Sequence, residues 1–144
     1  MGGLIRDDKG QWVIGFHRRI SHANSSCAVE CWAIREGLKL AMDRNLKGII
    51  VETDSLAASQ LINDSSNDNH ELNNIICDCR FMLQWLESEV KHIFLEGNHC
   101  ADLVASLNFQ QLCLVVFPNM PPPLGQALYD DASRKKFPRS RNSI

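Results

Sequence analysis

Strand-like runs alternate with helical periods along the first 107 residues, and this order limits the possible folds more than any other feature of the sequence. The predicted order is strand, strand, helix, strand, helix, helix, strand, helix. These elements span residues 2–6, 11–18, 27–45, 48–54, 56–63, 70–88, 90–95 and 98–107. A hairpin followed by strand–helix crossovers is typical of an α/β fold with a mixed sheet.

Two of these segments carry the clearest local signals. Residues 48–54 form a β-branched run of the kind found in buried parallel strands, and Ser55 follows it as a helix-capping residue. Asn98 is placed in the same way before the last predicted helix. Past Phe117 the composition changes to prolines and basic residues. We therefore expect one domain over residues 1–117 and a Pro-rich, basic, extended or disordered tail over 118–144.

Length and composition narrow the class of protein. A chain of 144 residues with 44% hydrophobic and 22% charged residues has room for one soluble globular domain. No apolar run approaches the roughly 20 residues of a membrane span, and the first residues lack the layout of a signal peptide. We expect an intracellular protein with no membrane partner, in the nucleus or the cytoplasm. The oligomeric state stays open.

The six cysteines and the charge distribution argue against a zinc-binding module and a strongly basic nucleic-acid-binding protein. No CxxC pair occurs, so buried thiols are favoured over a zinc finger or ribbon. The net charge of −2 divides into about +3 over residues 118–144 and −5 over the rest. The chain as a whole therefore lacks the net positive charge that attracts nucleic acid electrostatically. The basic cluster 134–136 is either a nuclear-localisation signal or, as we favour, part of a solvated tail.

Three carboxylates stand where local patterns do not explain them. Glu30 is the only polar residue in an otherwise apolar stretch of the predicted helix 27–45. Asp54 ends a buried strand, where ligand crevices form in α/β sheets. Asp102 lies in the first turn of the last helix among apolar neighbours. An ionised carboxylate in such surroundings is unfavourable by several kcal/mol unless a cation or donor meets it.

Each acid also has a purely structural interpretation. Glu30 can pair with an arginine or lie on the solvated edge of its helix. Asp54 and Asp102 can be N-terminal helix acids favoured by the helix dipole. Taken singly, the structural role is favoured for Asp54 and Asp102 and is about even for Glu30. Taken together, three such acids close in space favour a divalent cation.

The segments around these acids resemble a known family. Residues 29–38 (VECWAIREGL), 52–55 (ETDS) and 96–102 (EGNHCAD) resemble the three later motifs of the ribonuclease H fold, especially the reverse-transcriptase-associated, retrotransposon-derived domains abundant in plant genomes. The opening hairpin matches that family as well. The resemblance spans about residues 2–108, and four motifs in register are specific where one would be weak.

The resemblance implies a function and a set of site residues. Glu30, Asp54 and Asp102 would be catalytic residues that hold two Mg²⁺ or Mn²⁺ ions for hydrolysis of the RNA strand of an RNA–DNA hybrid. Asn98 and His99 lie beside the last acid and are candidates for contacting nucleic acid, either the hybrid or RNA. For Asn98 a helix cap is the favoured role. For His99 an exposed position is favoured over proton transfer.

One family motif has no counterpart in the sequence. The family's first catalytic Asp lies on a strand that precedes the hairpin and occupies the centre of the sheet. The resemblance therefore predicts an N-terminally truncated member with a ribonuclease H-like mixed sheet, flanking helices and no first strand, and with poor activity. The alternatives are a non-catalytic nucleic-acid-binding or interaction module, and an unrelated metal-dependent phosphotransfer enzyme. The last is weakened by the lack of a Gly-rich phosphate loop.

Overall fold

A computed structural model shows an α/β arrangement and describes residues 1–19, 25–64, 71–94, 98–107 and 114–133. The elements follow the predicted order as far as residue 106, and a strand, a 3₁₀ turn and a helix follow it. They are β1 (Gly2–Arg6), β2 (Trp12–His17), α1 (Ser26–Asp43), β3 (Ile50–Thr53), α2 (Leu56–Asn63), α3 (Asn73–Trp85), β4 (Glu89–His92), α4 (His99–Ser106), β5 (Val115–Phe117), a 3₁₀ turn (Pro122–Leu124) and α5 (Gly125–Ser133).

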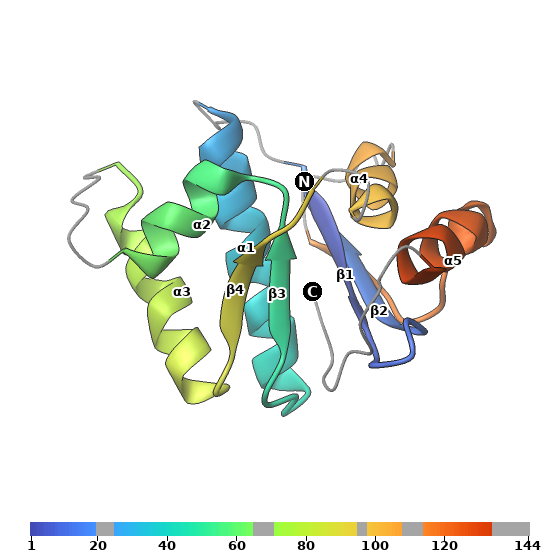
Figure 1. Cartoon of the computed structure of the whole chain (residues 1–144), viewed down its shortest axis with the longest axis horizontal. Helices are drawn as coiled ribbons and strands as arrows, with labels where there is room; N and C mark the ends of the chain where they lie inside the picture. The colour runs from blue at the N-terminus through green and yellow to red at the C-terminus, as the bar shows by residue number, and fades with distance from the viewer. Residues whose placement is uncertain (20–24, 65–70, 95–97, 108–113, 134–144) are drawn as a thin grey trace.

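The strands form two separate groups. β1, β2 and β5 make an antiparallel sheet in the order β1-β2-β5, and β3 pairs with β4 in parallel. Figure 1 shows β3 beside β1, yet within the described ranges no hydrogen-bonded ladder joins these two strands. The predicted α/β fold with a ribonuclease H-like mixed sheet is confirmed, and the place expected for a central strand lies between β1 and β3.

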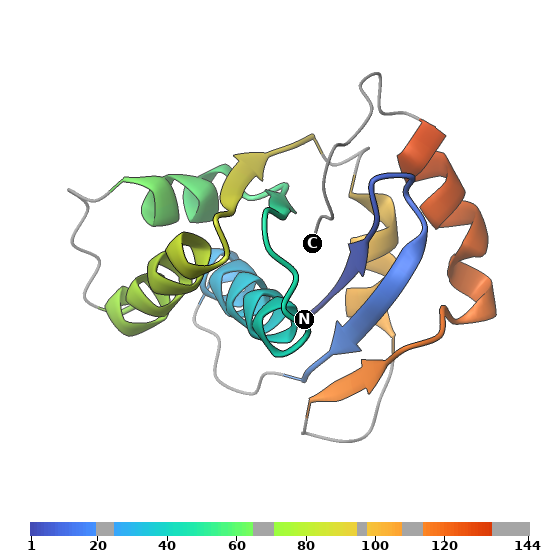
Figure 2. The same ribbon diagram turned by 90° about the horizontal axis from the view of Figure 1, so that it is seen from below.

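Alternating side chains of β1 divide the core into two layers. Ile5 belongs to the larger cluster, which α1, α3 and β3 share. Leu4 points to the other face, into a smaller cluster with Cys100 and Val104 of α4. Figure 2 shows α4 and α5 beside the β1-β2 hairpin and α1 on the side of α3. The sheet is therefore covered by helices on both faces.

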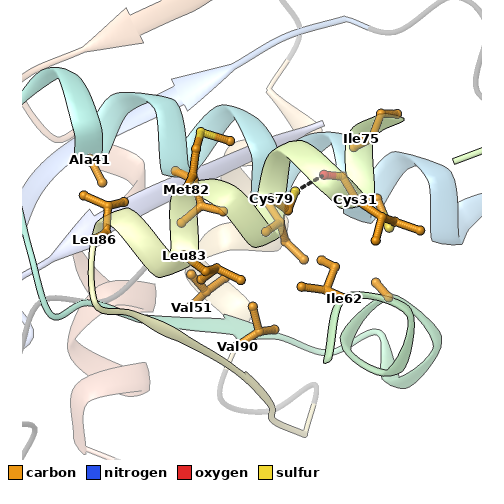
Figure 3. Packing of buried hydrophobic residues seen from close by; sticks show 14 of the residues in the cluster. Cys31, Ala41, Val51, Ile62, Ile75, Cys79, Met82, Leu83, Leu86 and Val90 are labelled. Carbon is orange, nitrogen blue, oxygen red and sulfur yellow. Dashed lines mark hydrogen bonds between the residues drawn. The ribbon is translucent and has the colours of Figure 1, made fainter. Parts of the chain in front are cut away.

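The larger cluster fixes α1 against α3 and β3. Figure 3 shows Cys31 of α1 and Cys79 of α3 meeting among aliphatic side chains, with the Cys79 thiol 3.9 Å from the Cys31 carbonyl oxygen. Burial raises the pKa of both thiols to about 12. Buried thiols are thus confirmed for these two residues and for Cys100, whereas Cys77 is exposed. Cys113 lies outside the described residues.

The prediction of a structureless tail from 118 onward is wrong for residues 122–133. Leu124, Ala127 and Leu128 recur at helical spacing and are buried in the smaller cluster against α4. The three prolines at 121–123 lead into this helix, because proline is tolerated in a first helical turn. The basic residues from 134 onward lie outside the described residues, so that part of the prediction stays untested.

The apolar segment before this helix contributes a strand that the sequence patterns did not predict. Val115–Phe117 pair antiparallel with β2 as the third strand of that sheet. Trp12 and Phe117 stack at 5.8 Å above Gly15, where any side chain would collide with the two rings. In the part of the chain that the structure describes, no helix is long and apolar enough to cross a membrane.

Candidate active site

Glu30 enters the site from the first half of α1. Its neighbours Cys31 and Ile34 are buried in the larger cluster, so the helix face that carries Glu30 lies close to the sheet. The carboxylate is half-buried and accepts a hydrogen bond from the hydroxyl of Thr53 on β3, at 3.3 Å between Oγ1 and Oε2. An arginine partner for Glu30 was one predicted alternative. Among the described contacts, the partner of Glu30 is instead the hydroxyl of Thr53.

Asp54 follows β3 directly, at the carboxyl end of a parallel strand. The next residue, Ser55, caps α2 by accepting a hydrogen bond from the backbone N–H of Ala58 at 3.1 Å. The backbone N–H of Ser55 in turn donates to Thr53 Oγ1 at 3.1 Å. Asp54 is therefore the half-buried middle residue of a fixed strand-to-helix bend.

Asp102 comes from the other side of the site, on the first turn of α4, where it is exposed. This helix approaches β1 so closely that a Cβ on Gly2 would lie 2.9 Å from the backbone nitrogen of Ala105. Only glycine allows such an approach without a shift of the helix. The close contact places Asp102 on the same side of the molecule as Glu30.

A pocket of about 70 Å³ lies between α1, β1, β3 and α4. Its wall includes Glu30, Thr53, Asn98 and Asp102, together with the glycines of β1. Asp54 does not line this pocket. The tertiary structure thus brings two of the three predicted acids to one pocket and leaves the third at its margin.

Asp54 and Asp102 nevertheless act on Glu30 electrostatically. Burial raises the pKa of Glu30, and the charges of Asp54 and, to a smaller extent, Asp102 raise it further. The hydrogen bond from Thr53 acts in the opposite direction. Glu30 is therefore a carboxylate whose ionised form is disfavoured by its surroundings.

The donor chemistry of the site suits a hard divalent cation, but the arrangement is incomplete. Mg²⁺ and Mn²⁺ prefer carboxylate and carbonyl oxygens, which these acids supply. Among the described residues, however, no three His, Cys, Asp or Glu side chains lie together closely enough to hold a metal ion. The residues described here do not make a metal centre by themselves.

The two residues beside Asp102 differ from each other. Asn98 occupies the N-cap position of α4, but its side chain makes no capping hydrogen bond and instead lines the pocket. The predicted capping role is therefore wrong, because the backbone at Asn98 departs from the extended conformation that N-caps adopt. His99 is exposed, as expected.

Sequence reasoning missed an ion pair that joins the two strand groups. Arg6 of β1 and Glu52 of β3 are linked at 3.0 Å between Nη2 and Oε2, and their side chains are only 6% and 10% exposed. Side chains alternate along β3, so Glu52 points to the opposite face of the strand from Val51 and Thr53. Strand periodicity therefore does direct Glu52 away from Glu30. Nothing local predicts its partner, which lies 46 residues away.

The arrangement of elements and acids defines a ribonuclease H-like domain, and comparison with known proteins agrees. The sequence profile described as reverse transcriptase-like matches residues 1–108, three quarters of the chain. The chain therefore belongs to the reverse transcriptase-like family.

A curated plant protein supports the same class. The chain is 28% identical over 141 residues to an Arabidopsis thaliana protein provisionally named as a ribonuclease H protein. The match covers 96% of this chain and 22% of that relative, so the chain spans less than a quarter of its length. No solved structure matches the chain. The predicted relationship to plant ribonuclease H-like domains is confirmed.

Proposed function

We propose that this domain binds RNA–DNA hybrids and contributes Glu30, Asp54 and Asp102 to Mg²⁺- or Mn²⁺-dependent hydrolysis of the RNA strand. The observation that carries the proposal is the pocket between α1, β1, β3 and α4, where Glu30 and Asp102 share a wall and Asp54 acts on Glu30. Family membership supports nucleic acid as the partner.

Hydrolysis requires a further oxygen donor at this pocket, because the described carboxylates do not assemble a metal centre. β1 and β3 both line this pocket and share no ladder in the described residues, so the donor would come from a segment that pairs with them. A strand bearing a carboxylate, supplied by another part of a longer polypeptide, would pair with both edges and point toward Glu30. We therefore expect activity to depend on that strand.

Recognition of the hybrid would rest on phosphates and 2′-hydroxyl groups, not on base edges. Asn98 lines the pocket beside Asp102, so its amide can donate to a phosphate or a sugar hydroxyl there. His99 is exposed at the start of α4 and extends the same edge. We infer weak, sequence-independent binding that falls as the salt concentration rises.

The experiment compares two forms of the protein on an end-labelled RNA–DNA hybrid with Mg²⁺. The first is the 144-residue chain, and the second carries an upstream strand with a single Asp. We expect cleavage by the extended form, lowered at least a hundredfold by Asp54→Asn or Glu30→Gln, since both replace a carboxyl group that can hold a divalent ion by a neutral amide. Asp8→Asn, in the exposed hairpin turn, is the matched control and should cleave normally. Cleavage that survives Asp54→Asn would contradict the catalytic assignment.

A second candidate function is a nucleic-acid-binding module without catalysis. It is favoured by the same lack of an assembled group of three metal-ligating side chains among the described residues. In this case the 144-residue chain and the extended form bind the hybrid equally, and neither cleaves it with Mg²⁺ or Mn²⁺. Fluorescence anisotropy with the labelled hybrid measures the binding, and a gel of the same samples measures cleavage.

A further inference from the structure

Thr53 is the last residue of β3, and its hydroxyl lies between the Glu30 carboxylate and the backbone N–H of Ser55. The residue is 1% exposed and points to the same face of the strand as Val51, toward α1. A buried hydroxyl is unfavourable unless its hydrogen-bonding capacity is used. A valine of the same shape would fill this position without that cost, so the hydroxyl itself needs an explanation.

The direction of its two hydrogen bonds is fixed by chemistry. The backbone N–H of Ser55 can only donate, so Thr53 Oγ1 must accept from it at 3.1 Å. The single hydroxyl proton of Thr53 is then left for Glu30 Oε2, 3.3 Å away. The three groups form one chain, N–H to O–H to carboxylate, in which each bond strengthens the next.

This chain connects the two elements that carry the first two acids. Glu30 comes from α1, and Asp54 lies between Thr53 and Ser55 in the bend that starts α2. From this geometry we propose that Thr53 is a positioning residue, whose hydroxyl fixes the Glu30 carboxylate relative to Asp54. The catalytic meaning of this inference rests on the proposed function, whereas the positioning itself does not.

A second buried hydroxyl provides the comparison that isolates this role. Ser59 is 4% exposed on α2, and its hydroxyl donates to the carbonyl oxygen of Leu56 in the same helix at 2.9 Å. It satisfies its own hydrogen-bonding capacity without touching an acid. Loss of a buried hydroxyl as such is therefore measured by Ser59→Ala, and loss of the link to Glu30 by Thr53→Val.

The first test uses NMR spectra of the purified 144-residue chain and needs no activity. Glu30→Ala removes the acceptor at one end of the chain of hydrogen bonds, and we expect the Ser55 amide resonance at the other end to move. In a Thr53→Val background the same substitution should move that resonance less than half as far, and Thr53→Ser should restore the full movement. An equal movement with valine at 53 would overturn the proposal.

The second test measures kcat and KM on the hybrid with the form that cleaves. Thr53→Val should lower kcat roughly tenfold with KM within about twofold, because a displaced carboxylate affects the transition state more than binding. Thr53→Ser should recover kcat, and Ser59→Ala should leave both constants unchanged. Wild-type kcat in Thr53→Val would overturn the proposal. If no form cleaves, the proposed function fails, and the NMR comparison alone decides the role of Thr53.

Discussion

At the scale of single residues, the site is dominated by a carboxylate in unfavourable surroundings. Glu30 is held on α1 by core packing of its neighbours, while burial and nearby acids raise its pKa. The folded chain therefore binds a proton at Glu30 more tightly than the unfolded chain does. The stability that this proton contributes is fully present below pH 4.5, the ordinary pKa, and is lost as the pH rises through the raised value.

We accordingly expect Glu30→Gln to unfold at a higher temperature than the wild type at pH 7 in EDTA. The advantage should disappear below pH 4.5, where Glu30 is protonated in both the folded and the unfolded chain. Thermal unfolding followed by circular dichroism between pH 3.5 and 8 measures the difference. Asp8→Asn in the exposed turn is the control. If the melting temperatures of Glu30→Gln and the wild type change with pH in the same way, the ionised form of Glu30 is not destabilised in the folded chain.

Glu36 is a second acid on α1, and its partner is a cation, whereas the partner of Glu30 is a hydroxyl. Glu36 is 3% exposed, and its carboxylate meets Arg18 at 2.8 Å. Arg35 pairs with the exposed Asp78, and both arginines lie over the ring of Trp32. Arg18 and Arg35 therefore differ mainly in the burial of the acid that each one faces.

Arg18→Met should lower the free energy of unfolding by about 3 kcal/mol, because it leaves the Glu36 carboxylate buried without its cation. Arg35→Met is the matched control, since it loses the same ring contact but only an exposed ion pair. We expect it to cost less than about 1 kcal/mol. Urea unfolding at pH 7 measures both variants. Equal losses would show that the ring contact, and not Glu36, determines the effect.

At the scale of elements, the C-terminal helix shows how a polar, proline-rich segment joins the core. α5 buries Leu128 against α4 while Tyr129, the next residue, is 68% exposed. The helix covers the outer side of α4, the element that carries Asp102. Its packing therefore contributes to the position of one wall of the pocket.

Leu128→Ala should lower the free energy of unfolding by roughly 2–3 kcal/mol, the usual effect of deleting a buried leucine side chain. Tyr129→Ala on the same helix should cost less than about 0.5 kcal/mol, because its side chain is largely in solvent. Chemical denaturation of the two variants provides the comparison. Small and equal effects would mean that α5 does not pack on α4 in solution.

At the scale of the whole molecule, the domain consists of two strand groups that helices and one ion pair hold together. α1 packs on β1 and accepts the hydrogen bond of Thr53 from β3 through Glu30, and the ion pair of Arg6 with Glu52 links β1 to β3. The ladder between β1 and β3 is lacking in the described residues, so backbone groups on both edges depend on other partners. Under the proposed function, the stability of the sheet and the binding of metal at the site would both depend on a strand that pairs with these two edges.

An added strand that pairs with β1 and β3 should raise the melting temperature by several degrees and slow amide exchange along both strands. Hydrogen–deuterium exchange of the 144-residue chain and of the extended form measures this. The β2–β5 ladder is the internal control, because its pairing involves neither β1 nor β3. Equal protection of β1 and β3 in the two forms would show that the added strand does not enter the sheet.

The sequence by itself determined the α/β class, the order of elements up to residue 106 and the three candidate acids, because hydrophobic periodicity and capping residues act within a few positions of the chain. Only the tertiary structure decided that Glu30 and Asp102 share a pocket with Asn98, that Asp54 stays at its margin, and that Thr53 and Arg6 link elements far apart in sequence. It also showed that residues 125–133, part of the predicted tail, form α5. The physical reason is that periodicity fixes which face a side chain occupies, whereas the distance between two faces depends on how whole elements pack.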